Sequence, residues 1–225
     1  MNQEFSFSKD GVTIIDLLDK EEFNYVTLKI CNHIRDGFGI GREFNIYEYH
    51  KWFERFESKR DYVLSPSNRH FPANFWKEID LENKIKRKIE TFYGKELSIW
   101  DEGYGTSAFR LVRPFHNDGY PPSKKSWGPA GQIISATIPI YGFTKKESQG
   151  FILGSHKKEY DSYLDPKQKF CKEERRLKDY KKYDYERFNL SIGQCIVFHW
   201  ETIHTEQIIG DCVTRLALEL RYESK

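Results

Sequence analysis

Residues 108–119 read AFRLVRPFHNDG, a short apolar run that ends in a histidine and an aspartate two positions apart. Side chains two positions apart in a strand point to the same face, so His116 and Asp118 can converge if the strand continues past Pro114. An imidazole and a carboxylate suit a divalent first-row metal, and a second histidine would complete a facial triad with open coordination positions. The alternative is that FHNDG forms an ordinary polar turn, and neighbouring segments must distinguish the two.

The sequence around this motif changes character near Gly94. After this glycine, β-type runs alternate with turn signals: LSIW, TSAFRLVRP, QIISATIPIY, GFILGS, NLSIGQCIVFHW, TEQII and TRLALELRY. Many short strands behind a helical segment predict a mainly β fold, a sandwich or barrel buttressed by helices. We expect one domain over residues 1–225, with a helical N-terminal portion at 1–95 and a β-barrel core at 96–225.

Before Gly94, helical spacing predominates. The run VTII predicts a strand, and Asp19 is expected to cap the helix that follows. The stretch IDLENKIKRKIETFYG predicts a second helix that ends at Gly94. The aromatic-rich residues 42–76 predict a helix in their first half, broken near Ser65 and Pro66. The apolar positions expected in the first helix include Phe23, Val26, Leu28 and Ile30.

One stretch of the predicted barrel, residues 157–187, is highly charged with both signs and contains several tyrosines. This composition is typical of a solvated excursion from the surface. Long insertions in compact domains are often functional, however, so the second interpretation is a lid over a site.

Composition excludes several classes of function. The formal net charge is +2 over 225 residues, so no strong basic field predicts a nucleic-acid or membrane partner. The four cysteines form no CxxC pair, which indicates neither a zinc knuckle nor a disulfide framework. The N-terminus has no apolar signal-peptide region, and no run approaches membrane-spanning length. We therefore expect a cytoplasmic protein, and its oligomeric state is left open.

The second histidine of the candidate metal site is expected in CIVFHWETIHTEQ, where His199 and His204 both qualify. The next strand, TRLALELRY, alternates charged residues with leucines and carries Arg215 near its start. A guanidinium pairs bidentately with a carboxylate, so this arginine suits a dicarboxylate cosubstrate. Arg215 follows His204 by eleven residues, enough for a strand, a turn and a returning strand that places the two side by side. This spacing favours His204, and His199 remains the alternative.

Taken in order, four segments resemble the phytanoyl-CoA dioxygenase family of Fe(II)- and 2-oxoglutarate-dependent oxygenases. They are RLVRPFHND, IISATIPIY, QGFILGSHKK and HTEQIIGDCVTR, which match that family's H-x-D strand, apolar strand, G-S-H-K turn and distal histidine followed by arginine. The opening DGVTIIDLLDKEEF also resembles the start of that family. The likeness runs from about residue 10 to residue 222 and leaves out the charged insertion.

The resemblance implies a double-stranded β-helix, the jelly-roll or cupin-like barrel, with N-terminal helices packed on one sheet. His116, Asp118 and His204 would bind Fe(II), and Arg215 would pair with the distal carboxylate of 2-oxoglutarate. The 2-oxo acid end then chelates the metal and leaves one position for O2, and oxidative decarboxylation drives oxidation of a substrate carbon. Asp118 favours hydroxylation, because halogenating relatives lack this carboxylate. Thr137 is the candidate for a hydroxyl contact to 2-oxoglutarate, although threonine is also a common strand residue.

The substrate is expected to be a small molecule that is polar or anionic, such as a sugar-, nucleotide- or carrier-linked metabolite. Arg110 shares strand parity with His116 and Asp118, and a buried arginine needs an anionic partner. Tyr120 and Trp127 follow the motif in the loop expected at the cavity mouth, close to two lysines whose alternative role is simple solvation.

Two other kinds of function remain open. A metal-dependent isomerase or hydrolase on the same barrel would need the histidines without the arginine. A barrel without activity could act as a binding module. Dependence on 2-oxoglutarate separates these alternatives from an oxygenase.

Overall fold

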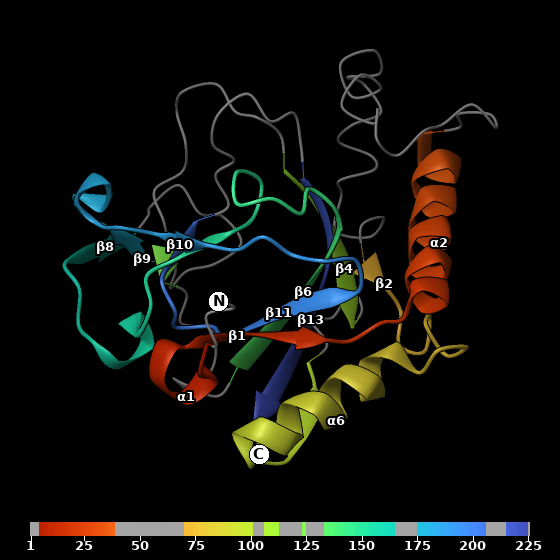
Figure 1. Ribbon diagram of the computed structural model, residues 1–225, viewed down its shortest axis with the longest axis horizontal. Coiled ribbons are helices and arrows are strands. Elements are labelled where there is room, and N and C mark those ends of the chain that lie inside the picture. The colour runs from red at the N-terminus through yellow and green to blue at the C-terminus, as the bar shows by residue number, and fades with distance from the viewer. Residues whose placement is uncertain are drawn as a thin grey trace.

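The computed structural model describes residues 5–38, 70–100, 106–112, 123–124, 133–164, 175–205 and 215–224 (Figure 1). Within these ranges the chain is mostly antiparallel β-structure arranged in two sheets, with a small number of helices. This confirms the expected mainly β fold with flanking helices. The helix expected in the first half of residues 42–76 lies outside the described residues. No helix in the described ranges is long and apolar enough to cross a membrane.

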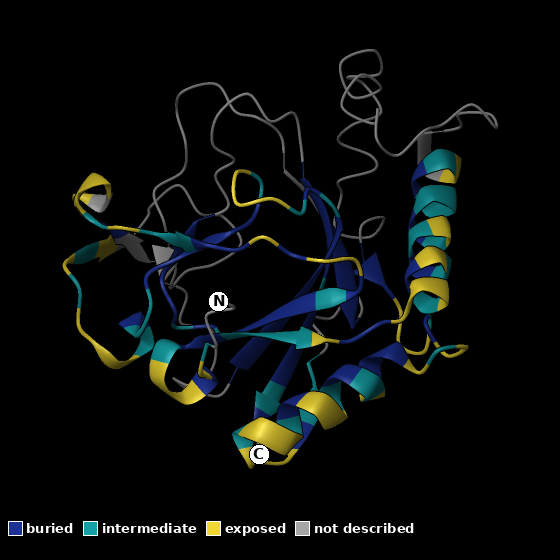
Figure 2. Ribbon diagram, viewed as in Figure 1, coloured by how far each residue is buried: buried dark blue, intermediate teal, exposed yellow. Residues whose placement is uncertain are grey.

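The larger sheet has the strand order β1–β11–β6–β13–β4–β2, and β3 pairs with β13 beside this path. All of its pairings are antiparallel. Most of its residues are buried, as the dark strands in Figure 2 show. Its strands are β1 (Val12–Asp16), β2 (His70–Phe71), β3 (Leu97–Ile99), β4 (Ser107–Val112), β6 (Ile133–Tyr141), β11 (Gln194–His199) and β13 (Arg215–Ser224).

The smaller sheet has the strand order β10–β7–β12–β5–β9–β8, and its strands are short. Apart from β8, β9 and β10, which all belong to the smaller sheet, the strands from β4 onward alternate between the sheets: β4, β6, β11 and β13 belong to the larger sheet, and β5, β7 and β12 to the smaller one. Successive strands of this alternating set therefore lie in opposite sheets. The strands of this sheet are β5 (Ser123–Lys124), β7 (Gly150–Phe151), β8 (Ser162–Leu164), β9 (Arg175–Leu177), β10 (Glu186–Arg187) and β12 (His204–Thr205).

Two helices, α2 (Lys20–Phe38) and α6 (Leu81–Tyr93), cover one face of the larger sheet (Figure 1). Their buried side chains form one cluster with alternate residues of the central strands, as expected for helices on a sheet. The cluster includes Val26, Ile30 and Ile34 from α2, Ile85 and Ile89 from α6, and Ile134, Ile138, Leu216 and Leu218 from the sheet.

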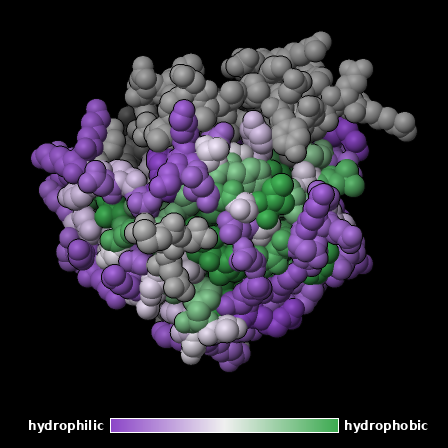
Figure 3. Space-filling model, viewed as in Figure 1, coloured by the Kyte–Doolittle hydropathy of each residue, from purple (hydrophilic) through white to green (hydrophobic). Residues whose placement is uncertain are grey.

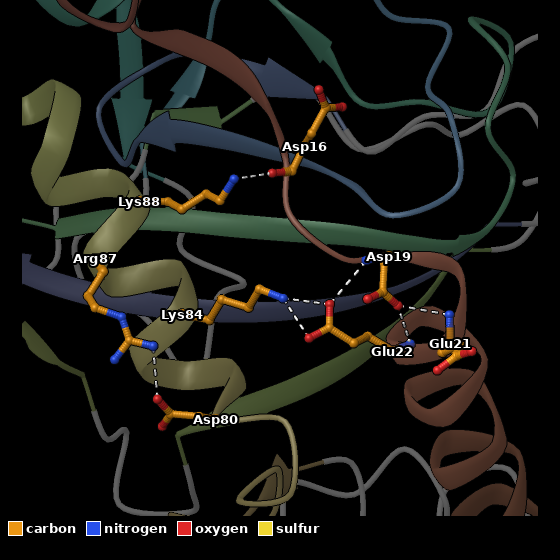
Figure 4. Close-up of polar contacts among 8 residues, drawn as sticks. All are labelled: Asp16, Asp19, Glu21, Glu22, Asp80, Lys84, Arg87 and Lys88. Atoms are coloured by element: carbon orange, nitrogen blue, oxygen red, sulfur yellow. Dashed lines mark hydrogen bonds and ion pairs between the residues drawn. The ribbon is translucent and has the colours of Figure 1, made fainter.

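Short-range hydrogen bonds start α2, and a glycine ends α6, at the residues that the sequence predicts. The Asp19 carboxylate accepts the N–H groups of Glu21 and Glu22, both at 2.9 Å, and Glu22 accepts the N–H of Asp19 at 3.0 Å (Figure 4). This reciprocal capping box starts α2. The same glutamate pairs with Lys84 of α6, so the cap also joins the two helices (Figure 4). Gly94 ends α6 in the left-handed region, with φ of 72°.

Leu28, one of the apolar positions expected in the first helix, lies on the exposed face of α2, with a relative exposure of 61%. Val26 and Ile30 are fully buried. Successive helical residues are rotated by about 100°, so Leu28 projects roughly opposite to both neighbours. Its apolar residue type therefore does not bury Leu28, because the helical period directs it away from the sheet.

The two faces of β13 separate as the sequence predicts, but both are buried. Leu216, Leu218 and Leu220 join the cluster under the helices. The opposite face carries Arg215, Glu219 and Arg221, and register places Glu219 opposite Thr137 and Arg221 opposite Ser135 on β6. On the next strand, β11, Ile196 pairs with Thr137 and Phe198 pairs with Ser135. These two residues pack against Phe151 of the smaller sheet and against Phe188, which follows β10. The charged face of β13 therefore lies in the space between the sheets and not in solvent.

The second apolar cluster, formed around Ile196, Phe198, Phe151 and Phe188, approaches the surface at its margin. In the view of Figure 3, hydrophobic residues gather over β11 and the segment that leads into it, and hydrophilic residues surround them. The interior between the sheets thus combines an apolar part with the polar row on β13.

The charged insertion at 157–187 is built into the smaller sheet in its described part. It contributes β8, β9 and β10, and β9 pairs with β5. Three of its tyrosines pack on an apolar cluster of this sheet, which a freely solvated excursion would not do. The cluster consists of Ile152, Leu177 and Ile203, with Tyr160, Tyr183 and Tyr185 against it.

Candidate functional site

His204 lies on β12 with its ring buried between the two sheets. Its ring centroid is 4.9 Å from that of Phe198 on β11 and 6.0 Å from that of Phe151 on β7. The Nδ1 atom is 2.8 Å from the carbonyl oxygen of Thr202. A carbonyl oxygen only accepts hydrogen bonds, so Nδ1 carries a proton, and in the neutral ring Nε2 is then the nitrogen that holds the lone pair. A histidine that binds a metal through Nε2 is oriented in this way by an acceptor behind it.

Three hydrogen bonds fix the backbone just before His204. The N–H of Ile203 donates to Ser155 Oγ at 2.8 Å, and its carbonyl accepts the N–H of Ile152 at 3.0 Å. The hydroxyl of Thr202 donates to the carbonyl of Gly11 at 2.9 Å. Ser155 and Thr202 are fully buried. Sequence reasoning did not assign a role to either residue, although the G-S-H-K turn was the signal that marked Ser155.

Gly11 allows the N-terminal turn to approach this segment. Its φ of 76° lies in the left-handed region, and a Cβ at this position would overlap His156 Nδ1 and Thr202 Oγ1. A side chain at residue 11 would therefore push away the residue whose carbonyl orients His204. Gly154 N–H completes the junction by donating to the carbonyl of Asp10 at 2.7 Å.

His199, the alternative ligand, occupies a different environment. Ile196 and Phe198 of β11 face the smaller sheet, and His199 stacks instead on Phe7 at 4.2 Å and on His156 at 4.9 Å between ring centroids. Burial lowers the pKa of His199 to about 4, with smaller contributions from His156 and nearby lysines. Burial also lowers the pKa of His156. The rings of His199 and His156 both point away from the space between the sheets. Of the two candidate ligands, His199 and His204, only His204 therefore faces that space.

Arg215 begins β13 with its side chain buried at 3% relative exposure. Its Nη1 donates to the carbonyl oxygen of Glu147 at 3.0 Å. Glu147 belongs to the turn that precedes β7, and Phe151 of β7 lies opposite His204 in the antiparallel register. The short segment 147–151 therefore contacts Arg215 at one end and pairs with His204 at the other. The structure thus links two residues that are eleven positions apart in the sequence to the two ends of one short segment.

Thr137 lies on the same face of the larger sheet as Arg215, but farther along it. It is opposite Glu219, four residues along β13 from Arg215, which corresponds to about 13 Å of strand. Its Oγ1 is buried and has no hydrogen-bond partner in the described part of the chain. The backbone of Arg110 pairs with Ala217, two residues from Arg215. Thr137 and Arg110 therefore pair with residues of β13 that lie four and two positions after Arg215.

The remaining predicted site residues, His116, Asp118, Tyr120 and Trp127, lie outside the described residues. Within the described ranges, no three His, Cys, Asp or Glu side chains come together in a way that could hold a metal ion. Two of the three predicted ligands are outside those ranges, so the complete triad stays a prediction.

No protein-family model matches this chain, and comparison with curated proteins finds no match. Solved structures of similar fold include AviO1 from Streptomyces viridochromogenes Tue57, with a TM-score of 0.59 and 11% identity over 96% of this chain and 91% of AviO1. The epimerase SnoN, solved with Fe3+, alpha ketoglutarate and nogalamycin RO, has a TM-score of 0.54 and 14% identity, covering 96% of this chain and 80% of SnoN. The non-heme alpha ketoglutarate dependent carbocyclase SnoK from nogalamycin biosynthesis has a TM-score of 0.52 and 16% identity, covering 96% and 81%. At these identities the likeness shows a shared fold.

Proposed function

We propose that this chain is an Fe(II)- and 2-oxoglutarate-dependent oxygenase. The observation that carries the proposal is that segment 147–151 accepts a hydrogen bond from buried Arg215 at Glu147 and pairs with buried His204 at Phe151. One residue presents an imidazole Nε2 and the other a buried guanidinium, which are the groups that a metal-chelated dicarboxylate requires. The fold shared with SnoN and SnoK supports the same class.

We also propose that the two sheets form a double-stranded β-helix of the phytanoyl-CoA dioxygenase type, over a single domain. The order β11–β6–β13–β4 in one sheet and β10–β7–β12–β5 in the other is what such a jelly roll requires of its core strands. The order of the motifs along the sequence supports this family, with the H-x-D pair after β4, the G-S-H-K turn after β7 and the distal histidine on β12.

His116, Asp118 and His204 would hold the iron, and the donor set fits a facial triad of two histidines and one carboxylate. When bound, the metal would supply, together with 2-oxoglutarate and O2, the chemistry that oxidises a carbon atom of the substrate. Arg215 binds the distal carboxylate of 2-oxoglutarate, because a buried guanidinium gains most from a charged partner. The Thr137 hydroxyl is buried without a partner on the same face and offers a further polar contact.

The described side chains around the His204 ring are apolar and would help to keep water away from the proposed site. Phe151 and Phe198 lie against its ring, and Ile196 and Phe188 extend the same apolar cluster. Exclusion of water strengthens the electrostatic interactions of the buried groups and protects reactive species from side reactions.

The proposed substrate is a polar or anionic small molecule, such as a sugar-, nucleotide- or carrier-linked metabolite. Pairing of β9 with β5 places Arg175 opposite Lys124 and Arg176 opposite Ser123. His204 is the partner of Ser123 on the other side, so Arg176 shares a row with the proposed metal ligand and Arg175 lies in the adjacent row. Arg110, Tyr120 and Trp127 are the proposed substrate contacts from the loop and strand around the H-x-D pair. The insertion at 157–187 would border the substrate as a lid or wall.

We propose hydroxylation as the outcome of the reaction, with Asp118 as the residue that favours it. The solved structures of similar fold include enzymes described as an epimerase and a carbocyclase, so product mass is the appropriate readout. Hydroxylation adds one oxygen atom, ring closure removes two hydrogen atoms, and epimerisation leaves the mass unchanged.

The proposal is tested by anaerobic titration of metal-free protein with Fe(II) and then with 2-oxoglutarate. We expect the visible absorption band of a 2-oxo acid chelated to iron, and we expect His116→Ala or Asp118→Ala to abolish it. Arg215→Leu should weaken 2-oxoglutarate binding by about 2–5 kcal/mol, because it removes the partner of a buried charge. The control is Arg87→Leu, which removes an exposed guanidinium paired with Asp80 on α6 and should change nothing.

Each failure of this experiment indicates another function. Iron binding without the absorption band would favour a non-oxidative isomerase or hydrolase, and no iron binding would favour a binding module. An Arg215→Leu variant with unchanged affinity would contradict the role of that arginine.

A further inference from the structure

Arg187 on β10 is a buried guanidinium with an unusual set of partners. Its relative exposure is 9%, and its Nη1 donates to the carbonyl oxygen of Ser148. No carboxylate of the described residues forms an ion pair with it, and burial lowers its pKa. A buried cation that lacks a counter-charge costs stability, so a methionine or leucine would serve better if only packing mattered.

The contact with Ser148 connects Arg187 to Arg215. The Ser148 hydroxyl accepts the N–H of Phe188, the residue after β10, at 3.0 Å. Arg187 and Phe188 thus hold Ser148 by its carbonyl and its side chain, respectively. The carbonyl of the preceding residue, Glu147, is the acceptor for Arg215. Two buried arginines from different sheets thus donate to neighbouring carbonyls of one turn.

Arg187 also reaches toward the strand of His204. Arg187, Gly150 and Thr205 are aligned in register across β10, β7 and β12. A Cβ at residue 150 would lie 3.0 Å from Thr205 Cγ2 and 3.2 Å from Arg187 Nε. The arginine therefore passes over β7 beside Thr205, the neighbour of His204, and a glycine at residue 150 makes room for it.

We propose that Arg187 is a positioning residue for the cosubstrate site. Through Ser148 it fixes the turn whose Glu147 carbonyl orients Arg215, and over Gly150 it packs beside the strand that carries His204. The inference rests on the proposed function, because it takes Arg215 as the group that binds the distal carboxylate of 2-oxoglutarate.

The test compares two ligands that differ only at the far end. 2-Oxoglutarate and 2-oxovalerate share the 2-oxo acid that would chelate iron, and 2-oxovalerate lacks the distal carboxylate. Dissociation constants are measured anaerobically on Fe(II)-loaded wild type, Arg187→Met and Arg187→Lys, and thermal unfolding is followed for each. We expect Arg187→Met to lose about 10- to 100-fold in affinity for 2-oxoglutarate, which is the typical loss when a residue that orients a metal-binding side chain is replaced. Binding of 2-oxovalerate should change little. Arg187→Lys, which keeps one donor for the Ser148 carbonyl, should recover part of the loss.

Two further variants make the result decisive. Ser148→Ala removes the bond to the Phe188 N–H and should show the same selective loss at smaller size, which tests the turn even if Arg187→Met does not fold. Arg87→Met, on the exposed surface of α6, is the control and should leave both affinities unchanged.

The outcomes separate this inference from the proposed function. If the wild type does not bind 2-oxoglutarate, the proposed function fails. If the wild type binds it and both Arg187→Met and Ser148→Ala keep the full preference over 2-oxovalerate, Arg187 has only a structural role. Equal weakening of both ligands would also overturn the inference, because it would indicate general loosening of the site.

Discussion

Replacing His199 by phenylalanine should prevent much of the loss of stability that this protein suffers under mildly acidic conditions. His199 stacks between Phe7 and His156, and Tyr93 lies edge-on at 5.7 Å. Burial, with smaller contributions from the neighbouring His156, Lys95 and Lys157, lowers its pKa from 6.5 to about 4. Phenylalanine keeps the stacked ring and cannot bind a proton.

The magnitude follows from the two pKa values. Between pH 6.5 and pH 4 the unfolded chain binds a proton at this residue that the folded chain does not bind, so acidification favours unfolding. Stability from the neutral imidazole is complete above the unfolded pKa of 6.5 and is lost as the pH falls through the folded pKa of about 4. At about 1.4 kcal/mol per pKa unit, the loss between pH 7.5 and pH 5 is about 2 kcal/mol.

The assay is urea unfolding of wild type and His199→Phe at pH 7.5 and pH 5. The wild type should lose about 2 kcal/mol more unfolding free energy between these pH values than the variant. Tyr93→Phe is the control, because it removes a hydroxyl beside the stack and leaves both imidazoles in place. If His199→Phe shows the full wild-type loss, His199 does not titrate as its burial implies.

Three other substitutions test the interior and the helix packing. Thr137→Val removes a buried hydroxyl that has no partner among the described residues, so chemical denaturation should show a gain of about 1–2 kcal/mol, and a loss would mean that the hydroxyl is satisfied. Ile30→Ala should cost about 2–5 kcal/mol of unfolding free energy because it opens a cavity under the sheet, whereas Leu28→Ala, at an exposed position, should stay within about 0.5 kcal/mol. Comparable losses in these two variants would contradict the orientation of α2.

Much of the secondary structure was predictable because its causes are local. The β-type runs IISATIPIY and TRLALELRY become β6 and β13, and VTII becomes β1. Asp19 starts a helix because its carboxylate reaches N–H groups only two and three residues away. Gly94 ends the second helix because it adopts a positive φ without strain. These choices depend on neighbouring residues and need no knowledge of the rest of the fold.

The site was predictable only in part. The sequence singled out His204 and Arg215 by spacing, and the structure places both in the interior beside one short segment. The sequence did not reveal that Ser155 and Thr202 hold the backbone before His204, although its G-S-H-K turn marked Ser155. The partners of these bonds come from distant parts of the chain. His116 and Asp118 stay predictions, because they lie outside the described residues.

The sequence by itself determined which segments become strands or helices, since periodicity and capping act over a few residues. Tertiary structure alone decided that the charged face of β13 is buried, that the insertion extends the smaller sheet, and that His199 faces the wall while His204 faces the interior. A strand offers two faces that differ only by alternation, and the sheet packed against each face determines what that face contacts. Those contacts join residues far apart in the chain, so local pattern alone cannot reveal them.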